Sequence, residues 1–265
     1  MNVFVREMKA NRKSLIIWCL SIVALIIIGM AKYSALKSSG ADMEGLLKGM
    51  PQAVQSMFGM GYLNIMEIKG YYAVLYVYFL LMVGVHASML GANIISKEEQ
   101  DKTADFLLSK PAKRSQIITG KLSAAALNVL IFNLAALISS VVLVGYYNKG
   151  KSINKEIFLL MFGMLIFQLI FLSLGTLLAS FNKNSKTAAS LSTAVILSAY
   201  MLSILIDLNS KLDNLKYLTP FKYFQAKDVI TADGYQAKFI ILSIILITSF
   251  IAGTYLFYSK RDMNV

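Results

Sequence analysis

The chain alternates between long apolar runs and shorter segments that carry its charges. Six runs contain no Lys, Arg, Asp or Glu: Leu15–Ala31, Tyr71–Ile95, Leu122–Tyr147, Ile157–Phe181, Ala188–Ile206 and Phe239–Tyr258. A helix that crosses the hydrocarbon core needs roughly 20 mostly apolar residues, and these runs are of about that length. They are continuous rather than alternating, which favours helices over barrel strands. The pattern predicts an all-α membrane protein with six transmembrane helices, which form one domain over residues 1–265.

Composition supports this prediction. Hydrophobic residues make up 57% of the 265 residues and charged residues 15%, whereas soluble domains carry about 25% charged residues. The net charge of +12 could suggest a nucleic-acid partner, but the cations lie beside the ends of the apolar runs, where they meet lipid headgroups. Cys19 is the single cysteine, so neither a disulfide nor a CxxC metal site is expected.

The basic residues predict the orientation. With six spans, both termini lie on one side of the membrane, together with residues 96–121 and 182–187. These segments are short, yet they hold all four arginines of the chain: Arg6, Arg12, Arg114 and Arg261. The positive-inside rule therefore predicts cytoplasmic termini in a protein of the cell membrane.

The first outer segment, residues 32–70, is rich in methionine. Met43, Met50 and Met57 belong to one apolar stripe at helical spacing, which indicates an amphipathic helix at the membrane surface. Methionine thioethers could instead bind Cu(I). No His or Cys accompanies them, so we favour the amphipathic helix and expect no metal site or other cofactor.

Residues 145–152 match the phosphate-binding pattern G-x-x-x-x-G-K-[ST], from Gly145 to Lys151 and Ser152. In a P-loop this pattern follows a short strand and starts a helix of a soluble domain. Here it follows a membrane span and lies on the predicted outer side. We interpret the match as coincidental, and we expect no ATPase activity in this chain.

His86 is the only histidine and lies inside the second apolar run. Ionisable groups inside a membrane are candidates for proton relays. No Asp, Glu, Lys or Arg lies in any of the six runs, so a neutral, hydrogen-bonded histidine in the bundle interior is favoured.

The segment between the second and third spans, residues 96–115, combines charges with an apolar end. Its acidic residues favour the start of a short helix, Phe106 to Leu108 form an apolar tip, and Pro111 interrupts the helix. Such a helix is suited to insert into a groove of a partner, although a solvated connector would have a similar composition.

Three motifs carry a family resemblance. The pattern Glu98-Glu99-x-x-x-Thr103-x-x-x-Leu107-Leu108-Ser109-x-Pro111-x-x-Arg114, followed by Lys121, resembles the corresponding loop of ABC-2-type ABC transporter permeases. The other two motifs are Met50-Pro51-Gln52-Ala53 with Phe58-Gly59, and Tyr217-Leu218-Thr219-Pro220-Phe221-Lys222-Tyr223-Phe224. Lys102 replaces the usual glycine before the loop threonine, and Ala104-Asp105 replaces the usual Leu-Glu.

The resemblance implies a permease that pairs with a second permease, identical or different, and with a separate ABC ATPase. Residues 96–115 would be its coupling helix, and the segment around Pro220 an outer re-entrant element. It also implies an N-terminal interfacial helix, with Phe4 and Met8 against lipid and Arg6 outward. The implied ATPase contacts are Glu98, Glu99, Thr103, Phe106, Leu107, Leu108 and Arg114. The implied substrate pathway follows the second and fifth spans, at Gly84, Ser88, Gly91, Ser190, Ser192, Thr193 and Ser198.

Two function classes follow. The first is an exporter subunit for a hydrophobic peptide, antibiotic, lipid or ion. The second is a scaffold or sensor subunit that does not transport. The small residues of the implied pathway also suit close helix packing without any role in transport.

Overall fold

The computed structural model describes residues 3–39, 64–102, 113–148, 153–182 and 187–260, together with Gly49, Pro51 and Gln55. Helices dominate these ranges, which contain no strand: α1 (Val3–Ser39), α4 (Ile68–Gln100), α6 (Arg114–Tyr147), α7 (Asn154–Phe181), α8 (Ala188–Leu208), η1 (Ser210–Leu218), η2 (Pro220–Lys222), α9 (Ala226–Thr231) and α10 (Ala237–Lys260). The helices α1, α4, α6, α7, α8 and α10 are long and apolar enough to cross a membrane. The predicted all-α fold with six spans is confirmed.

Most of the long helices extend beyond the apolar runs that predicted them. α1 begins at Val3 rather than Leu15, and α4 continues to Gln100 rather than ending at Ile95. The flanking residues are mainly helix formers such as Arg, Lys, Glu, Met and Ala, and none of the three prolines lies among them. The expected N-terminal interfacial helix is therefore continuous with the first span.

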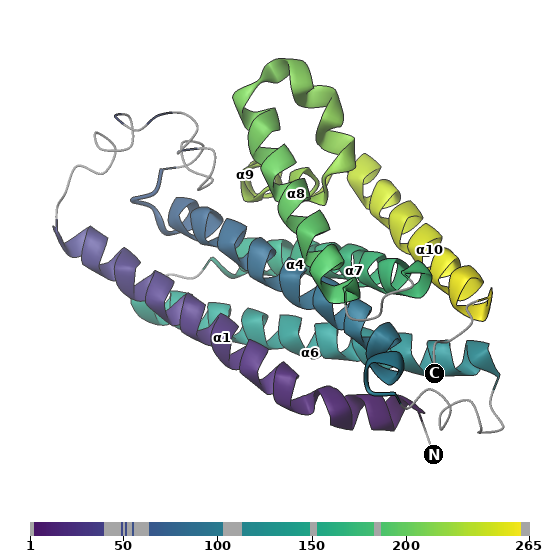
Figure 1. Ribbon diagram of the computed structural model, residues 1–265. Coiled ribbons are helices and arrows are strands. Elements are labelled where there is room, and N and C mark those ends of the chain that lie inside the picture. Colours follow the sequence, from purple (N-terminus) through teal and green to yellow (C-terminus); the bar gives the residue numbers. More distant parts are fainter. Residues whose placement is uncertain are drawn as a thin grey trace.

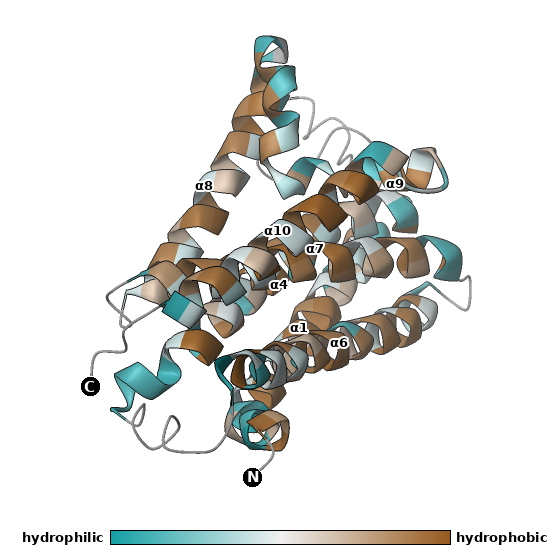
Figure 2. Ribbon diagram, turned by 90° about the vertical axis from the view of Figure 1, so that its right-hand side faces the viewer, coloured by the Kyte–Doolittle hydropathy of each residue, from teal (hydrophilic) through white to brown (hydrophobic). Residues whose placement is uncertain are grey.

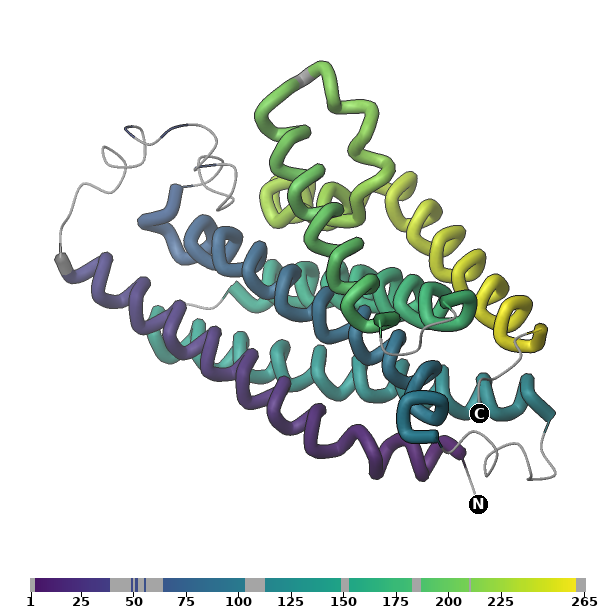
Figure 3. Tube along the Cα trace, in the orientation of Figure 1, coloured from purple at the N-terminus to yellow at the C-terminus, as the bar shows by residue number. Residues whose placement is uncertain are grey.

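The arrangement has α4 and α7 at its centre. These two helices pack against each other along much of their length, α1 pairs with α6 on one side, and α10 lies along α7 on the other (Figures 1 and 3). α8 packs against α4, and the short elements η1, η2 and α9 connect it to α10. Figure 2 shows hydrophobic residues along the long helices, with hydrophilic residues mainly towards the ends.

Glycines allow the backbones of α4 and α7 to touch. A Cβ atom added to Gly91 of α4 would lie 2.2 Å from the carbonyl oxygen of Leu172. A Cβ atom added to Gly175 of α7 would lie 2.2 Å from the carbonyl oxygen of Ser88. Backbone atoms cannot move aside as a flexible side chain can, so only glycine fits at either position.

This contact gives a stability prediction. Gly91→Ala and Gly175→Ala are each expected to destabilise the protein by about 1–3 kcal/mol, since each methyl group overpacks a backbone contact. Gly145→Ala in α6 is the matched control, because nothing lies within 4 Å of its added Cβ atom. Thermal unfolding in detergent measures the difference. Equal melting temperatures for all three variants would contradict the close approach.

Candidate functional site

One end of the bundle, which we call the terminal end, brings together the first turns of α1 and α6 and the last turns of α4 and α10 (Figure 1). Nη1 of Arg114 donates a hydrogen bond to the carbonyl oxygen of Ser259 at 3.0 Å. The hydroxyl groups of Thr119 and Tyr255 lie 2.7 Å apart. The start of α6 is therefore fixed to the end of α10.

Four charged side chains form a cluster at the terminal end: Arg6, Glu7, Glu98 and Lys121. One carboxylate oxygen of Glu98 accepts a hydrogen bond from Arg6, and the other accepts one from Lys121. Lys121 is fully buried, and its Nζ also donates to the carbonyl oxygen of Ile94 at 2.5 Å. Arg6 also pairs with Glu7, at 2.6 Å. This charge cluster joins α1, α4 and α6.

The charge cluster also corrects one prediction. The acidic residues at 98 and 99 do not start a loop helix, because they lie in the last turn of α4. A negative charge is unfavourable at the C-terminal end of a helix, where carbonyl dipoles point outward. The cations Arg6 and Lys121 offset this cost at Glu98. In the same way, a buried ammonium group is tolerated at Lys121 only because Glu98 and a carbonyl oxygen surround it.

The N-terminal residues also differ from their predicted positions. Arg6 does not point outward, since its guanidinium group turns to Glu7 and Glu98. Phe4 and Met8 pack against the protein core rather than only against lipid. The amide nitrogen of Asn128 in α6 lies 3.1 Å from the sulfur of Met8.

The predicted ATPase-contact residues fall into two groups. Glu98 is buried, whereas Glu99 and Arg114 are half-buried at the ends of α4 and α6 that flank the loop. Thr103, Phe106, Leu107 and Leu108 lie outside the described residues. The first part of the expected coupling segment 96–115 belongs to α4 and its last two residues belong to α6.

Lys102 directly follows the C-cap of α4 and has a φ of 54°. This left-handed conformation is common just after helix ends and is usually adopted by glycine, which lacks a Cβ atom. The glycine that the resemblance implies at this position would adopt this conformation without strain, and Lys102 adopts it with a side chain.

The predicted substrate-pathway residues lie in several different environments. Gly84 lies against Ile196 and Phe167, and Gly91 and Ser88 lie at the α4–α7 contact. In α8, Ser192 is buried and Thr193 half-buried, each bonded to a carbonyl oxygen of its own helix. Ser190 and Ser198 are exposed.

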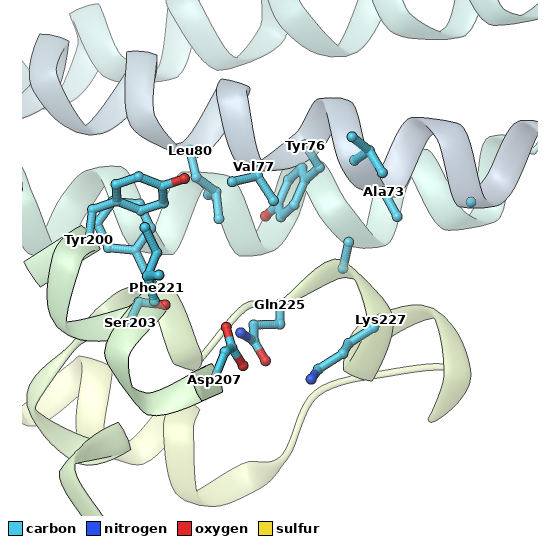
Figure 4. Close-up of a pocket in the computed structure, with 14 residues that line it drawn as sticks. Ala73, Tyr76, Val77, Leu80, Tyr200, Ser203, Asp207, Phe221, Gln225 and Lys227 are labelled. Carbon is cyan, nitrogen blue, oxygen red and sulfur yellow. The ribbon is translucent and has the colours of Figure 1, made fainter. Parts of the chain in front are cut away.

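A cleft lies instead towards the opposite ends of the same two helices. Figure 4 shows Tyr76, Val77 and Leu80 of α4 facing Tyr200, Ser203 and Asp207 of α8, with Phe221, Gln225 and Lys227 on the remaining side. Aromatic and aliphatic side chains line most of this α4–α8 cleft, and Asp207, Gln225 and Lys227 make one of its ends polar. It can hold a molecule with an apolar body and a polar group. Sequence reasoning pointed to the same two helices but not to these residues, because it searched for small side chains.

An ion pair lies at the polar end of the α4–α8 cleft. Nζ of Lys222 is 2.6 Å from Oδ1 of Asp207, and the two side chains are 5% and 14% exposed. Burial lowers the pKa of Lys222, and Asp207 partly opposes this change. The pair joins the end of α8 to η2, and so fixes the segment around Pro220 against the bundle.

Two isolated sequence features have structural explanations. His86 is buried between the rings of Trp18 and Phe132, with centroid distances of 5.2 and 4.6 Å. Its Nδ1 has no hydrogen-bond partner among the described residues, so at this atom the expected hydrogen bond is not found. Gly145 lies inside α6, which differs from the loop position of a first P-loop glycine. Residues 149–152 of that match, and Met43, Met50 and Met57, lie outside the described residues. Among the described residues, no group of three His, Cys, Asp or Glu side chains is placed to hold a metal.

Comparison with models of known protein families identifies the family of this six-span chain. The model of a family described as "ABC-2 family transporter protein" matches residues 1–263. The chain belongs to the ABC-2 transporter family. It is therefore a multi-pass membrane protein and a transmembrane permease subunit rather than a catalytic one. A comparison with curated proteins found no significant match to this ABC-2 permease. The resemblance deduced from its loop motifs is confirmed over nearly the whole chain.

Proposed function

We propose that this permease subunit exports a hydrophobic or amphipathic compound, powered by ATP hydrolysis in a separate ABC ATPase. The observation that carries the proposal is the charge cluster, which links both flanks of the 96–115 segment to α1. A segment that receives force from a partner needs such firm attachment to the spans.

The ATPase would bind the segment between α4 and α6. Phe106, Leu107 and Leu108 would enter a cleft of the ATPase, and Glu99, Thr103 and Arg114 would fix their register. Short helices with apolar tips commonly use this kind of recognition, in which a few residues provide most of the binding energy. Because Glu98 is buried against Lys121, its part would be to position the segment.

A second permease subunit would cover the outer face of α8. Leu197, Met201 and Leu205 follow one another at helical spacing on that face and are 47%, 47% and 52% exposed. Either an identical or a different permease chain would satisfy this apolar stripe.

The substrate would occupy the α4–α8 cleft before release. Its apolar walls favour a hydrophobic peptide, antibiotic or lipid over a small ion, since a bare ion would lose hydration without gaining ligands there. The polar residues at one end would orient the polar group of such a substrate.

Reconstitution tests the proposal. The permease is copurified with a candidate ABC ATPase from the same cell, and the complex is placed in vesicles of phosphatidylethanolamine and phosphatidylglycerol. ATP hydrolysis by the complex is expected to exceed that of the ATPase alone. Failure to bind any ABC ATPase would instead support a scaffold or sensor that does not transport.

Cysteine labelling tests the proposed orientation with cytoplasmic termini. After Cys19 is replaced, single cysteines at Ser38 and Ser210 are expected to react with an impermeant thiol reagent added to intact cells. A cysteine at Ser185 is expected to react only after the cells are opened. Labelling of Ser185 alone in intact cells would reverse the orientation.

A further inference from the structure

Two residues of the charge cluster, Arg6 and Lys121, lie outside both the predicted ATPase contacts and the α4–α8 cleft. Lys121 lies in the second turn of α6 and is fully buried. Burial of a lysine costs several kcal/mol unless its charge is compensated, and an apolar residue of similar size often serves stability as well or better. Packing alone therefore does not explain a lysine at this position.

The arrangement of the hydrogen bonds explains it. Lys121 of α6 binds Glu98 and the carbonyl oxygen of Ile94, both in α4. Arg6 of α1 binds the other carboxylate oxygen of Glu98. A single carboxylate thus receives one cation from each neighbouring helix. Since charged hydrogen bonds depend strongly on distance and direction, this arrangement fixes all three helix ends relative to one another, which apolar contacts do less strictly.

Glu98 and Lys121 stand on either side of the loop between α4 and α6, so their ion pair affects how that loop is attached. Glu98 lies just before the loop between α4 and α6, and Lys121 lies shortly after it. The ion pair therefore closes the base of the loop, and Arg6 attaches the first turn of α1 to that base. Contacts outside the charge cluster act on the same helices, because Gly120 approaches Val3 and Asn128 approaches Met8.

We infer that Lys121, Glu98 and Arg6 are positioning residues that make the ends of α1, α4 and α6 move as one rigid unit when the loop between α4 and α6 is displaced. The inference rests on the proposed function only for the source of that displacement. The rigidity itself is a property of the permease alone. Without the charge cluster, a push on the loop would separate the helix ends instead of moving them together.

The test separates rigidity from stability. Lys121→Met leaves Glu98 partly unpaired and is expected to lower the melting temperature. The double variant Glu98→Gln with Lys121→Met removes both charges of the pair, so much of that loss should be recovered. Glu156→Gln is the matched control. It breaks the ion pair with Lys69, which also involves α4 but lies at its other end and is more exposed.

Spin labels at Lys9 and Ser115, two exposed positions on α1 and α6, report the rigidity. In the purified permease without Cys19, the distance distribution is expected to be narrow for the parent and the control, and broad for the double variant. In the ATPase complex, MgATP with vanadate should leave the parent distance unchanged but shift it in the double variant. In the double variant, the stimulation of ATP hydrolysis by the permease should be at least about fivefold smaller than with the parent.

The possible outcomes distinguish the inferred rigidity of the helix ends from the proposed function in ATP-driven export. A narrow distribution and full stimulation in the double variant would overturn the inference and leave the charge cluster as a purely structural feature. Equal broadening in the Glu156→Gln control would also overturn it. If the parent binds no ATPase, the proposed function fails, whereas the distance measurement on the permease alone still decides the rigidity.

Discussion

Asp207→Asn is expected to destabilise the permease by about 3 kcal/mol. The substitution leaves the ammonium group of Lys222 buried without the carboxylate that it faces, and breaking a buried pair in this way costs about 3–5 kcal/mol. The lower end of that range applies because Asp207 retains some exposure. Thermal unfolding in detergent measures the loss.

The same variant is expected to depend on pH in a specific direction. Burial already lowers the pKa of Lys222, and loss of Asp207 lowers it further. The nearby Lys227 also lowers this pKa, whereas Asp228 raises it. Between this folded-state pKa and the ordinary value of about 10.4, the unfolded chain binds more protons than the folded one. Stability therefore rises with pH in that window, and the destabilisation is complete below it.

Asp233→Asn provides the control for Asp207→Asn. Asp233 pairs with Lys155, but both side chains are mostly exposed, at 61% and 68%, so its loss should cost at most about 1 kcal/mol. Asparagine also tolerates the φ of 53° at this position. If Asp207→Asn were no more damaging than Asp233→Asn at neutral pH, the ion pair would not hold η2 to α8.

Leu107→Ala combined with Leu108→Ala is expected to weaken binding of the ATPase by about 2 kcal/mol, or roughly thirtyfold. The proposed interface places both side chains in a pocket of the ATPase, and anchors of this kind concentrate binding energy. Titration of the ATPase against immobilised permease measures the affinity. Membrane insertion should not change, because both residues lie outside the six apolar runs of the sequence.

Ile241→Ala combined with Ile245→Ala is the control for the loop variant. Both side chains lie on α10 and are more than half exposed, which makes them comparable apolar truncations far along the chain from the loop. They should leave ATPase affinity unchanged. Wild-type affinity in the loop variant would show that residues 96–115 only connect two spans.

The six spans could be predicted because long apolar runs have few alternatives in a bilayer. The helix ends could not, since polar helix formers extend α1 and α4 past the point where hydropathy falls. The same limitation affected Glu98. Its place in the loop motif was clear, but its partners Arg6 and Lys121 lie far away in sequence and follow no helical period. A search for charges that flank different spans on the same side would have found them.

The α4–α8 cleft shows a different limitation. Sequence reasoning assigned the pathway to small residues on the second and fifth spans, and Gly84 and Gly91 proved to be sites of helix contact. The cleft is lined by large side chains such as Tyr76 and Tyr200, whose spacing in the sequence resembles that of any buried aromatic residue. Only the positions of η2 and α9 reveal which of them face an open space.

The backbone contact between Gly91 and Leu172, with its counterpart at Gly175 and Ser88, restricts how the permease can change shape. If either helix slid along the other by one residue, the neighbouring side chains would meet a backbone. α4 and α7 are therefore expected to move together as one body in any conformational change of the permease. Distances measured between α4 and α7 should stay constant when the ATPase complex hydrolyses ATP.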